Sequence, residues 1–279
     1  MITPGRCDLH VHSSHSDGIL SPAEVVRAAE KARLCAVSVT DHDTAAGQEE
    51  ALEAGTERSV EVVTGIEMSV SESGLDIHIL GYMFDHRHGA LVSVLEVLEA
   101  SRHDRAEKMT GLLRGEGVDI DFDEVEKEGG AGTLGRPHIA RLLMRKKVVT
   151  RFQEAFERFI GYGACCYVPK KVLPLEQVVE VITRAGGVPV WAHPGPAIYD
   201  GALLERMVSA GIRGIEAYHP NHKDAIARKI VATAAGKDLA VTGGSDYHFP
   251  EAMKVPIGGV DVPCSAVDTL RERAGRLST

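Results

Sequence analysis

The sequence predicts an α/β fold in which parallel strands are joined by crossover helices and a helical segment interrupts the alternation. Short β-rich runs alternate with amphipathic helical stretches in both halves of the chain, which is typical of such folds. Residues 90–163, between the halves, are helical, charged and almost without strand signal. Histidines and carboxylates follow the ends of several expected strands, where barrels gather their functional residues.

The first strand and the first helix have the clearest signals. Residues 6–12 (RCDLHVH) are expected to form a strand. Ser21 then caps a helix that has Pro22 at its first position and Glu24 three residues after the cap, a combination that favours helix initiation. The next expected elements are strand 34–43, helix 45–57, strand 60–70 and strand 76–84.

The alternation resumes after about residue 165. Its expected elements are, in order, helix 174–186, strand 188–193, helix 201–210, strand 214–219, helix 223–236, strand 239–246 and a last strand and helix. Because both halves show the same pattern, we assign residues 1–89 and 164–279 to one barrel domain and residues 90–163 to an inserted helical cap.

The composition is that of a globular protein. Hydrophobic residues make up 44% and charged residues 25% of the 279 residues, which excludes the disordered and membrane classes. The N-terminus lacks a basic region followed by an apolar stretch. We therefore expect a cytoplasmic protein with no membrane contact and no obligate protein partner.

The charge and the cysteines limit the partners and the compartment. A net charge of -9 disfavours electrostatic binding of nucleic acid over an extended surface, although a local basic patch could bind phosphate groups. The five cysteines form no CxxC motif, and an odd, scattered set argues against a disulfide framework. We expect buried or inert thiols at Cys7, Cys35, Cys165, Cys166 and Cys264.

Two histidines at the end of the first strand, His10 and His12, alternate with Val11. Because side chains alternate along a strand, both imidazoles share one face, which in a β/α barrel is the interior at the active-site rim. Paired imidazoles suit a divalent transition metal, and Asp17 in the next loop can return to the same rim. The pattern alone also fits histidines that hydrogen-bond within a strand end, so further ligands are needed.

Further candidate ligands lie at or near the ends of the other expected strands. They are Asp41 and His42 (TDHD), Glu67, His78, His193 (WAHP), and Asp246 and His248 (GSDYH). Because the ends of barrel strands share one rim, coincidence explains this set poorly. The polar surroundings of His86, His88 and His103 favour solvated side chains instead.

Together, the HxH, TDHD, lone Glu, strand His, AHP and SDxH motifs resemble those of the PHP (polymerase and histidinol phosphatase) domain family over nearly the whole chain. The resemblance implies a distorted (β/α)7 barrel with two to three divalent ions, usually manganese, zinc or iron. It implies one ion at His10, His12, Glu67 and Asp246, a second that Glu67 shares with His78 and His193, and a third at Asp17, His42 and His248. Some relatives have a histidine in place of Asp17, so the third site can differ in strength or selectivity.

The predicted chemistry is hydrolysis of a phosphate ester. Nitrogen and oxygen ligands without cysteine argue against a closed structural zinc site. Metal ions acidify bound water and stabilise charge on a phosphoryl group, so we expect in-line attack of a metal-bound hydroxide without a covalent enzyme intermediate. The residues expected to carry catalysis are His10, His12, Glu67, His193 and Asp246. Asp41 is expected to orient a ligand rather than to bind metal.

Candidate substrate contacts lie in the insert and after a late strand. Arg102 and Arg136 suit bidentate recognition of phosphate oxygens, and the helix that begins at Arg136 and His138 adds N–H groups. The alternative for each arginine is a solvated surface position. The resemblance favours phosphate contact, because the insert with GRPHIAR looks like that of phosphatases of AMP or nucleoside 3',5'-bisphosphates, a subgroup also linked to 5'-end trimming of short RNA. In YHPNHK, His222 is expected to contact substrate more than His219.

The leading hypothesis is therefore a metal-dependent phosphomonoesterase that acts on a nucleotide. The alternatives are a histidinol-phosphatase-like enzyme, a 5'-3' exoribonuclease on short RNA, a non-catalytic metal-binding module, and an amidohydrolase-like C–N hydrolase. A non-catalytic module predicts lost ligands, and no expected position is missing. The C–N hydrolases often bridge their metals with a carboxylated lysine, whereas the third strand here offers Glu67.

Overall fold

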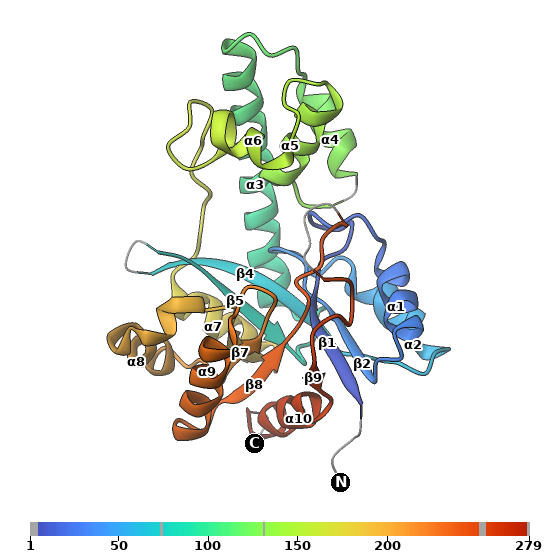
Figure 1. The fold of residues 1–279 in the computed structure, drawn as a ribbon, viewed down its shortest axis with the longest axis vertical. Coiled ribbons are helices and arrows are strands. Elements are labelled where there is room, and N and C mark those ends of the chain that lie inside the picture. The colour runs from blue at the N-terminus through green and yellow to red at the C-terminus, as the bar shows by residue number, and fades with distance from the viewer. Residues whose placement is uncertain (1–4, 73–74, 131, 251–254, 278–279) are drawn as a thin grey trace.

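The computed structural model describes residues 5–72, 75–130, 132–250 and 255–277 and has a mixed α/β fold with two sheets (Figure 1). The strand orders are β3-β2-β1-β9 and β4-β5-β6-β7-β8. The first sheet consists of β1 (Arg6–Val11), β2 (Ala36–Val39), β3 (Glu61–Val62) and β9 (Val262–Pro263). The second consists of β4 (Gly65–Glu72), β5 (Leu75–Tyr82), β6 (Val188–Trp191), β7 (Gly214–Tyr218) and β8 (Ala240–Gly243).

The strand directions are mixed, which corrects the expectation of parallel strands throughout. Pairing is parallel within β1-β2-β3 and within β6-β7-β8, but antiparallel for β4 with β5, β5 with β6 and β1 with β9. β4 ends at Glu72 and β5 begins at Leu75, a separation too short for the crossover that a parallel pair needs. Isolated bridges at Val11–Tyr247 and His42–Glu67, rather than a continuous ladder, connect the two sheets among the described residues. A closed (β/α)7 barrel is therefore not confirmed.

The strand expected at residues 60–70 is split into β3 and β4 because the chain crosses from one sheet to the other. Gly65 marks the crossing: a Cβ there would meet Ser38 Oγ at 2.0 Å and Val39 O at 2.9 Å. Only glycine permits so close an approach. β3 thus extends the first sheet, whereas β4 begins the second and carries Glu67 to the site.

Helices cover the outer faces of the sheets (Figure 1). They are α1 (Pro22–Lys31), α2 (Gln48–Thr56), α7 (Leu175–Arg184), α8 (Gly201–Ser209), α9 (Asp224–Gly236) and α10 (Ser265–Leu277), with a short 3-10 helix at Gly195–Tyr199. α1 begins as expected, because Ser21 and Glu24 accept hydrogen bonds from each other's backbone N–H and Pro22 follows the cap. No helix in the described part of the chain has the length and apolarity needed to cross a membrane.

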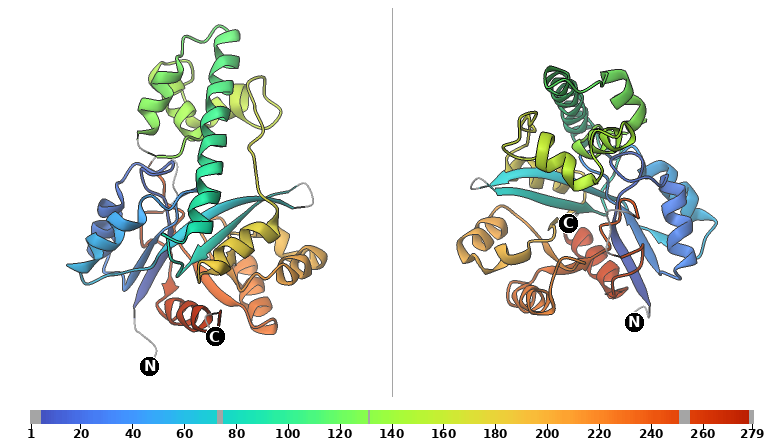
Figure 2. Two further views of the ribbon diagram at one scale, coloured as in Figure 1. Left: turned by 180° about the vertical axis from the view of Figure 1, so that it is seen from behind. Right: turned by 45° about the horizontal axis from the view of Figure 1, so that its top comes forward.

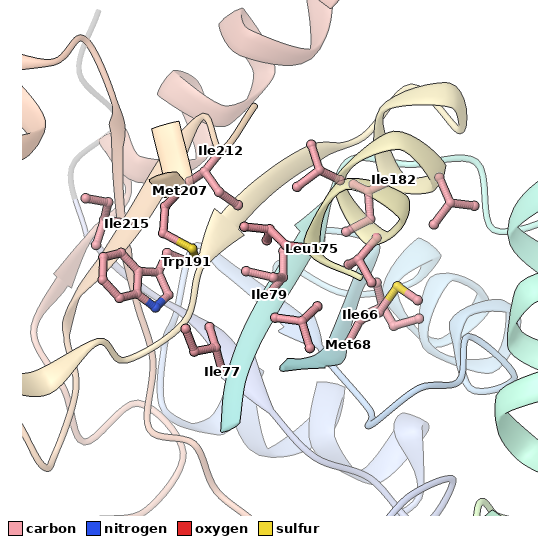
Figure 3. Packing of buried hydrophobic residues seen from close by; sticks show 14 of the residues in the cluster. Ile66, Met68, Ile77, Ile79, Leu175, Ile182, Trp191, Met207, Ile212 and Ile215 are labelled. Atoms are coloured by element: carbon pink, nitrogen blue, oxygen red, sulfur yellow. The ribbon is translucent and has the colours of Figure 1, made fainter. Parts of the chain in front are cut away.

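The largest hydrophobic core lies between the second sheet and the helices that cover it (Figure 3). Ile66 and Met68 of β4 and Ile79 of β5 are fully buried there. Because side chains alternate between the faces of a strand, this register sends Glu67 and His78 to the opposite face. The packing of the core therefore decides which polar side chains point into the site.

A bundle of helices projects from the sheets where the insert was expected (Figures 1 and 2). It comprises α3 (Gly89–Gly115), α4 (Phe122–Gly129), α5 (Arg136–Arg145), α6 (Phe152–Ala155) and a π-helical turn (Phe156–Ile160). Leu91 and Leu95 of α3 pack in the core of the second sheet, whereas Met109 and Leu113 pack in a separate cluster with α5. One continuous helix thus ties the bundle to the sheets.

Two cysteines are paired, which corrects the expectation of free thiols throughout. Cys35 and Cys264 form a disulfide whose Cα atoms are 6.4 Å apart, across 229 residues of sequence. The pairing follows from the sheet, because Cys35 lies just before β2 and Cys264 just after β9, and both strands flank β1. Free thiols occur at Cys7, Cys165 and Cys166, of which Cys165 is exposed.

Opening this disulfide is expected to destabilise the fold. A cross-link over so long a loop restricts the unfolded chain, and the loss of a native disulfide typically costs about 2–5 kcal/mol. Cys35→Ser should therefore lower the free energy of unfolding in a non-reducing denaturant titration. Cys165→Ser, at an exposed free thiol, should leave it unchanged. Equal stability of Cys35→Ser and the wild type would contradict the cross-link.

Candidate metal centre

The site begins with the two histidines at the end of β1. His10 and His12 are fully buried, and their Nε2 atoms lie 3.2 Å apart. Val11 between them packs into a hydrophobic cluster with α1, as the two-residue period of a strand requires. Both imidazoles therefore lie on one face, as the sequence predicts.

Glu67 of β4 lies at the centre of the cluster. Its side chain is 1% exposed, and its two oxygens face five imidazoles. Oε1 lies 2.8 Å from His78 Nδ1 and 3.0 Å from His193 Nε2. Oε2 lies 3.1 Å from His42 Nδ1, 3.2 Å from His12 Nε2 and 3.4 Å from His10 Nε2. One carboxylate thus joins histidines from four separate segments.

Two buried polar atoms in this cluster have no hydrogen-bond partner. Glu67 Oε2 and His42 Nδ1 lie 3.1 Å apart, yet neither makes a hydrogen bond of acceptable geometry within the described residues. Buried polar atoms without partners are costly, and a bound cation would satisfy both of these. Imidazole and carboxylate are suitable ligands for divalent transition metals. The residues present therefore fit such ions.

Two aspartates complete the cluster from the loops after β1 and β8. Asp246 Oδ1 lies 3.2 Å from His12 Nε2, and Asp17 Oδ1 lies 3.3 Å from His248 Nε2. Three groups, each with its ligand atoms within 4.8 Å of one another, could hold a metal ion: His12, Asp17, His42 and His248; His10, His12 and Glu67; and His42, Glu67 and His78. The fold thus brings together the candidate metal ligands that the sequence suggested.

Burial and the carboxylates have opposing effects on the imidazoles, and burial prevails at His42, whose pKa lies well below the ordinary value. Burial alone would lower the pKa of His10, but Glu216 and Glu67 raise it well above the ordinary histidine value. Burial alone would raise the pKa of the Glu67 carboxyl, but His42 and His78 hold it well below its usual range. The site therefore attracts cations, and metal ions compete with protons for the same nitrogens.

Hydrogen bonds and strained backbone fix the loops that carry the ligands. Asp41 accepts from Ser13 N at 2.7 Å and from Ser16 Oγ at 2.6 Å, so it orders the loop after β1. His193 and Asp246 have positive φ angles of 25° and 52°. Such conformations cost about 1–3 kcal/mol in residues other than glycine, so they persist only where the surrounding structure holds the backbone in place.

Glu216 of β7 is a candidate site residue that sequence reasoning missed. It is fully buried, its Oε1 lies 3.0 Å from His10 Nδ1, and its Oε2 accepts from His193 N at 2.8 Å. These contacts fix the ring of His10 and the backbone of His193, as carboxylates often do behind metal-binding histidines. The sequence did contain a signal for Glu216: it is a carboxylate inside the otherwise apolar run GIEAY. A carboxylate in a buried strand usually has a partner, since such residues are seldom buried without one.

Replacing Glu216 with Gln is expected to weaken metal binding without removing a ligand. The neutral amide keeps the shape but loses the charge that orients His10, and such changes lower metal affinity by about 10- to 100-fold. Titration of the metal-free variant with Mn²⁺ or Zn²⁺ measures the effect. Glu180→Gln, at an exposed carboxylate of α7, is the control. An unchanged affinity in Glu216→Gln would refute the positioning role.

The two arginines suggested as phosphate contacts lie beside the cluster. Arg102 and Arg136 line a cavity of about 140 Å³ together with the candidate ligands Asp17, His42 and His78. Arg102 donates to Asp43 Oδ2 from Nε at 2.9 Å and from Nη2 at 2.6 Å. These bonds hold its guanidinium at the wall of the cavity.

His138 is placed differently from the arginines. It is 1% exposed and accepts a hydrogen bond from Gly135 N at 3.0 Å. Burial lowers its pKa to about 4, and it lines another cavity, with His15 and Arg141. His138 therefore contacts the backbone at the start of α5 and does not line the cavity that contains Arg136.

His222 is occupied by backbone groups. Its Nε2 accepts from Gly195 N at 3.1 Å, and its Nδ1 lies 2.8 Å from Ala217 O. His219 lies nearer to the candidate metal ligands, with Nε2 3.2 Å from Asp246 Oδ2. Of the two histidines in YHPNHK, the structure therefore brings His219 to the cluster.

A match over more than half of the chain decides the family. The PHP domain matches residues 8–160, which include the HxH pair, TDHD and the lone Glu67. The chain belongs to the PHP domain family.

Relatives of this PHP protein are named as enzymes that act on phosphate esters. A 5'-3' exoribonuclease of Haemophilus influenzae is 32% identical over 88% of this chain and 90% of the relative. A 3',5'-nucleoside bisphosphate phosphatase of Chromobacterium violaceum is 33% identical, over 87% of each chain. A phosphoribosyl 1,2-cyclic phosphate 1,2-diphosphodiesterase of Eggerthella lenta is 33% identical over 92% of this chain and 98% of the relative.

Two solved structures resemble this PHP fold over most of its length. A protein of Bifidobacterium adolescentis described as a candidate metal-dependent phosphoesterase has a TM-score of 0.89 and 29% identity, over 98% of each chain. A protein of Chromobacterium violaceum described as an amidohydrolase, with bound sulfate and no metal, has a TM-score of 0.84 and 31% identity, over 92% of each chain. Together with the family match and the relatives named above, the first of these structures identifies this chain as a metal-dependent phosphoesterase.

The sequence analysis did not identify two further cationic side chains in the cavity of this PHP enzyme. Arg105 lines the cavity one turn after Arg102 on α3 and donates to Val168 O at 2.7 Å. Lys170 donates to Ser69 Oγ at 2.9 Å and lies 3.5 Å from His78 Nε2. The three-residue spacing of the arginines, which places both on one helix face, was the signal that could have identified Arg105.

Proposed function

We propose that this PHP enzyme removes a phosphate monoester from a nucleotide, with AMP or a nucleoside 3',5'-bisphosphate as substrate and the bisphosphate preferred. Relatives named as a bisphosphate phosphatase and as 5'-3' exoribonucleases support a nucleotide substrate, whereas a relative of similar identity is named for a phosphoribosyl cyclic phosphate. The observation that carries the proposal is the cationic cavity beside the ligand cluster.

Four cationic side chains and two carboxylates line the cavity: Arg102, Arg105, Arg136, Lys170, Asp17 and Asp76, of which Asp76 pairs with Lys170. Arg102 is paired with Asp43, but within the described residues neither Arg105 nor Arg136 makes an ion pair with a carboxylate. Burial and the nearby guanidinium groups of Arg136 and Arg102 lower the pKa of Arg105 to about 10. A second phosphate would relieve this repulsion and accept charge-assisted hydrogen bonds. A bisphosphate supplies both anions, one for the ligand cluster and one for the arginines.

Two to three divalent ions, manganese, zinc or iron, are the proposed cofactors. The proposed sets of ligands are His10, His12, Glu67 and Asp246; Glu67, His78 and His193; and Asp17, His42 and His248. When bound, such ions polarise phosphoryl oxygens and make water a nucleophile at neutral pH. The catalytic role proposed for His10, His12, Glu67, His193 and Asp246 is to hold these ions in place.

The insert at residues 90–163 is proposed to act as a cap that recognises the substrate. Arg102 and Arg136 would present N–H groups to phosphate oxygens. The cap is anchored on the site, because Thr133 donates to His15 O from its backbone at 2.9 Å and to His42 O from Oγ1 at 3.1 Å.

Of the expected substrate contacts, we propose that Arg102 and Arg136 bind the substrate directly. For His138 and His222 we propose a supporting role, because their ring nitrogens bond to backbone groups. The two histidines would then hold the start of α5 and the loop after β6, respectively.

A second candidate function is 5'-3' exonuclease activity on short RNA. Relatives with this name cover most of the chain, and the arginines that would hold a second phosphate of a bisphosphate would equally hold the next phosphodiester of an RNA. The acidic chain, with a net charge of -9, disfavours long nucleic acid, but a local groove suffices for a short one.

A substrate panel tests the proposal. Phosphate release is measured from AMP, adenosine 3',5'-bisphosphate, histidinol phosphate and a 5'-phosphorylated oligoribonucleotide, with mononucleotide release as an additional readout for the last. We expect the highest kcat/KM with the bisphosphate. Hydrolysis of histidinol phosphate alone would sink the nucleotide assignment.

A further inference from the structure

We propose that Tyr162 and Tyr167, here called the aromatic ledge, form a stacking site for a nucleobase outside the arginine cavity. The stacked base would belong to the nucleotide that follows the phosphate held by Arg105 and Arg136. The inference rests on the proposed nucleotide substrate and names the residues that would hold the base of a second nucleotide.

Tyr162 is displayed to solvent by an ordered turn. Its exposed fraction is 91%, whereas the next most exposed large hydrophobic residue among those described, Tyr199, is at 58%. The turn is closed by Ala164 N, which donates to Gly161 O at 3.0 Å, and Gly163 follows Tyr162 with a φ of +79°. A left-handed residue at this position of a turn favours glycine. The backbone thus holds the ring outward.

The turn is fixed at its base to the π-helical segment. Gly161 N donates to Phe156 O at 2.8 Å, and a Cβ at Gly161 would meet that oxygen at 2.4 Å. Glycine is therefore needed there for the close approach. This anchoring limits the freedom of Tyr162 relative to the cavity, which Phe156 also lines.

Ring contacts connect the exposed tyrosine to the arginine cavity. The rings of Tyr162 and Tyr167 lie edge to face with centroids 5.5 Å apart. The guanidinium groups of Arg105 and Arg136 each lie 5.8 Å from the centroid of the Tyr167 ring. Arg136 also lies 5.4 Å from the Phe156 ring. Cations and aromatic rings therefore form one path from the ligand cluster to the surface.

This arrangement matches how proteins bind single strands without sequence preference. Such sites combine cations that follow the phosphates with aromatic rings on which bases stack. A single exposed aromatic residue needs no explanation by itself. Tyr162 is distinguished by its place: it continues the ring and guanidinium contacts of Tyr167, whereas Tyr199 makes no ring contact within the described residues.

The test compares Tyr162→Ala with the wild type on three substrates in the metal-loaded full-length enzyme. They are adenosine 3',5'-bisphosphate, a 5'-phosphorylated trinucleotide, and the same trinucleotide with its second residue abasic. We expect KM for the trinucleotide to rise about tenfold, because stacking on one aromatic side chain contributes roughly 1–3 kcal/mol. KM for the bisphosphate and for the abasic trinucleotide should stay unchanged.

Two control variants separate stacking from other effects. Tyr162→Phe keeps the ring and should behave as the wild type, and Tyr199→Ala removes another exposed tyrosine and should have no effect. The proposed stacking site would be refuted if Tyr162→Ala raised KM for the bisphosphate as much as for the trinucleotide. It would also be refuted if KM for the abasic trinucleotide rose as much as KM for the intact one.

The outcome for the ledge can be distinguished from the outcome for the proposed function. If the enzyme hydrolyses 4-nitrophenyl phosphate but no nucleotide, the proposed function fails. The inhibition constant of the trinucleotide against 4-nitrophenyl phosphate then measures its binding. A tenfold weaker inhibition of Tyr162→Ala than of the wild type would support the ledge, and equal inhibition would refute it.

Discussion

Glu67→Gln is expected to abolish both metal binding and turnover. The substitution keeps the shape of the side chain but removes the negative charge that faces five imidazoles at 2.8–3.4 Å. Metal ions contribute several kcal/mol to phosphoryl transfer, and each tenfold in rate corresponds to about 1.4 kcal/mol. A loss of roughly 10³-fold or more in kcat/KM should therefore accompany the loss of metal.

The metal content and the activity of Glu67→Gln are measured on the same sample. Elemental analysis gives the metal, and release of phosphate gives the activity. Glu49→Gln is the matched control, because Glu49 also contacts a histidine, His86, but lies on α2 outside the cluster. If Glu67→Gln kept full activity and the wild-type metal content, Glu67 would not be a central metal ligand.

The double variant Arg105→Ala, Arg136→Ala is expected to lose most of its activity towards a nucleoside bisphosphate. Hydrogen bonds to charged groups contribute about 1.5–3 kcal/mol each, so loss of both guanidinium groups should lower kcat/KM by roughly 10²-fold or more. The metal content should not change, because neither residue belongs to the groups that could hold an ion. Steady-state kinetics on adenosine 3',5'-bisphosphate and on AMP measures the effect.

The comparison of these two substrates identifies which phosphate the arginines hold. If they hold the second phosphate, AMP hydrolysis should fall much less than bisphosphate hydrolysis. Arg114→Ala, at an exposed position of α3, controls for the general loss of positive charge. Equal losses for AMP and the bisphosphate would assign the arginines to the reacting phosphate and contradict the proposed arrangement.

Local signals predicted the individual elements better than their arrangement. The Ser21 capping box and the alternation around Val11 depend on neighbouring residues, and the structure has both. The split at Gly65 and the reversal between β4 and β5 depend on contacts between sheets. An apolar run such as 60–70 contains no information about which sheet it joins, because a strand has the same side-chain period in either sheet.

The candidate site was predictable where its residues follow strand ends. His42, His193 and Asp246 follow β2, β6 and β8, and the ends of adjacent strands converge whatever the details of the sheet. Glu216 lies within β7 and acts through His10, so a rule about strand ends could not find it.

Tertiary contacts decided the remaining residues of the site. Lys170 reaches His78 from a segment about 90 residues away in sequence. His138 shares a helix with Arg136, yet it faces another cavity. Cys35 and Cys264 meet only because β2 and β9 flank β1.

The most direct test of the central claim is anomalous scattering from crystals of the metal-loaded enzyme, recorded on both sides of the manganese, iron and zinc edges. We expect two or three anomalous peaks within coordination distance of Glu67, Asp17 and their surrounding histidines. His10→Ala, His12→Ala should lose the peak nearest β1 together with turnover. An active crystal without any anomalous peak among these residues would contradict a metal-dependent site built on Glu67.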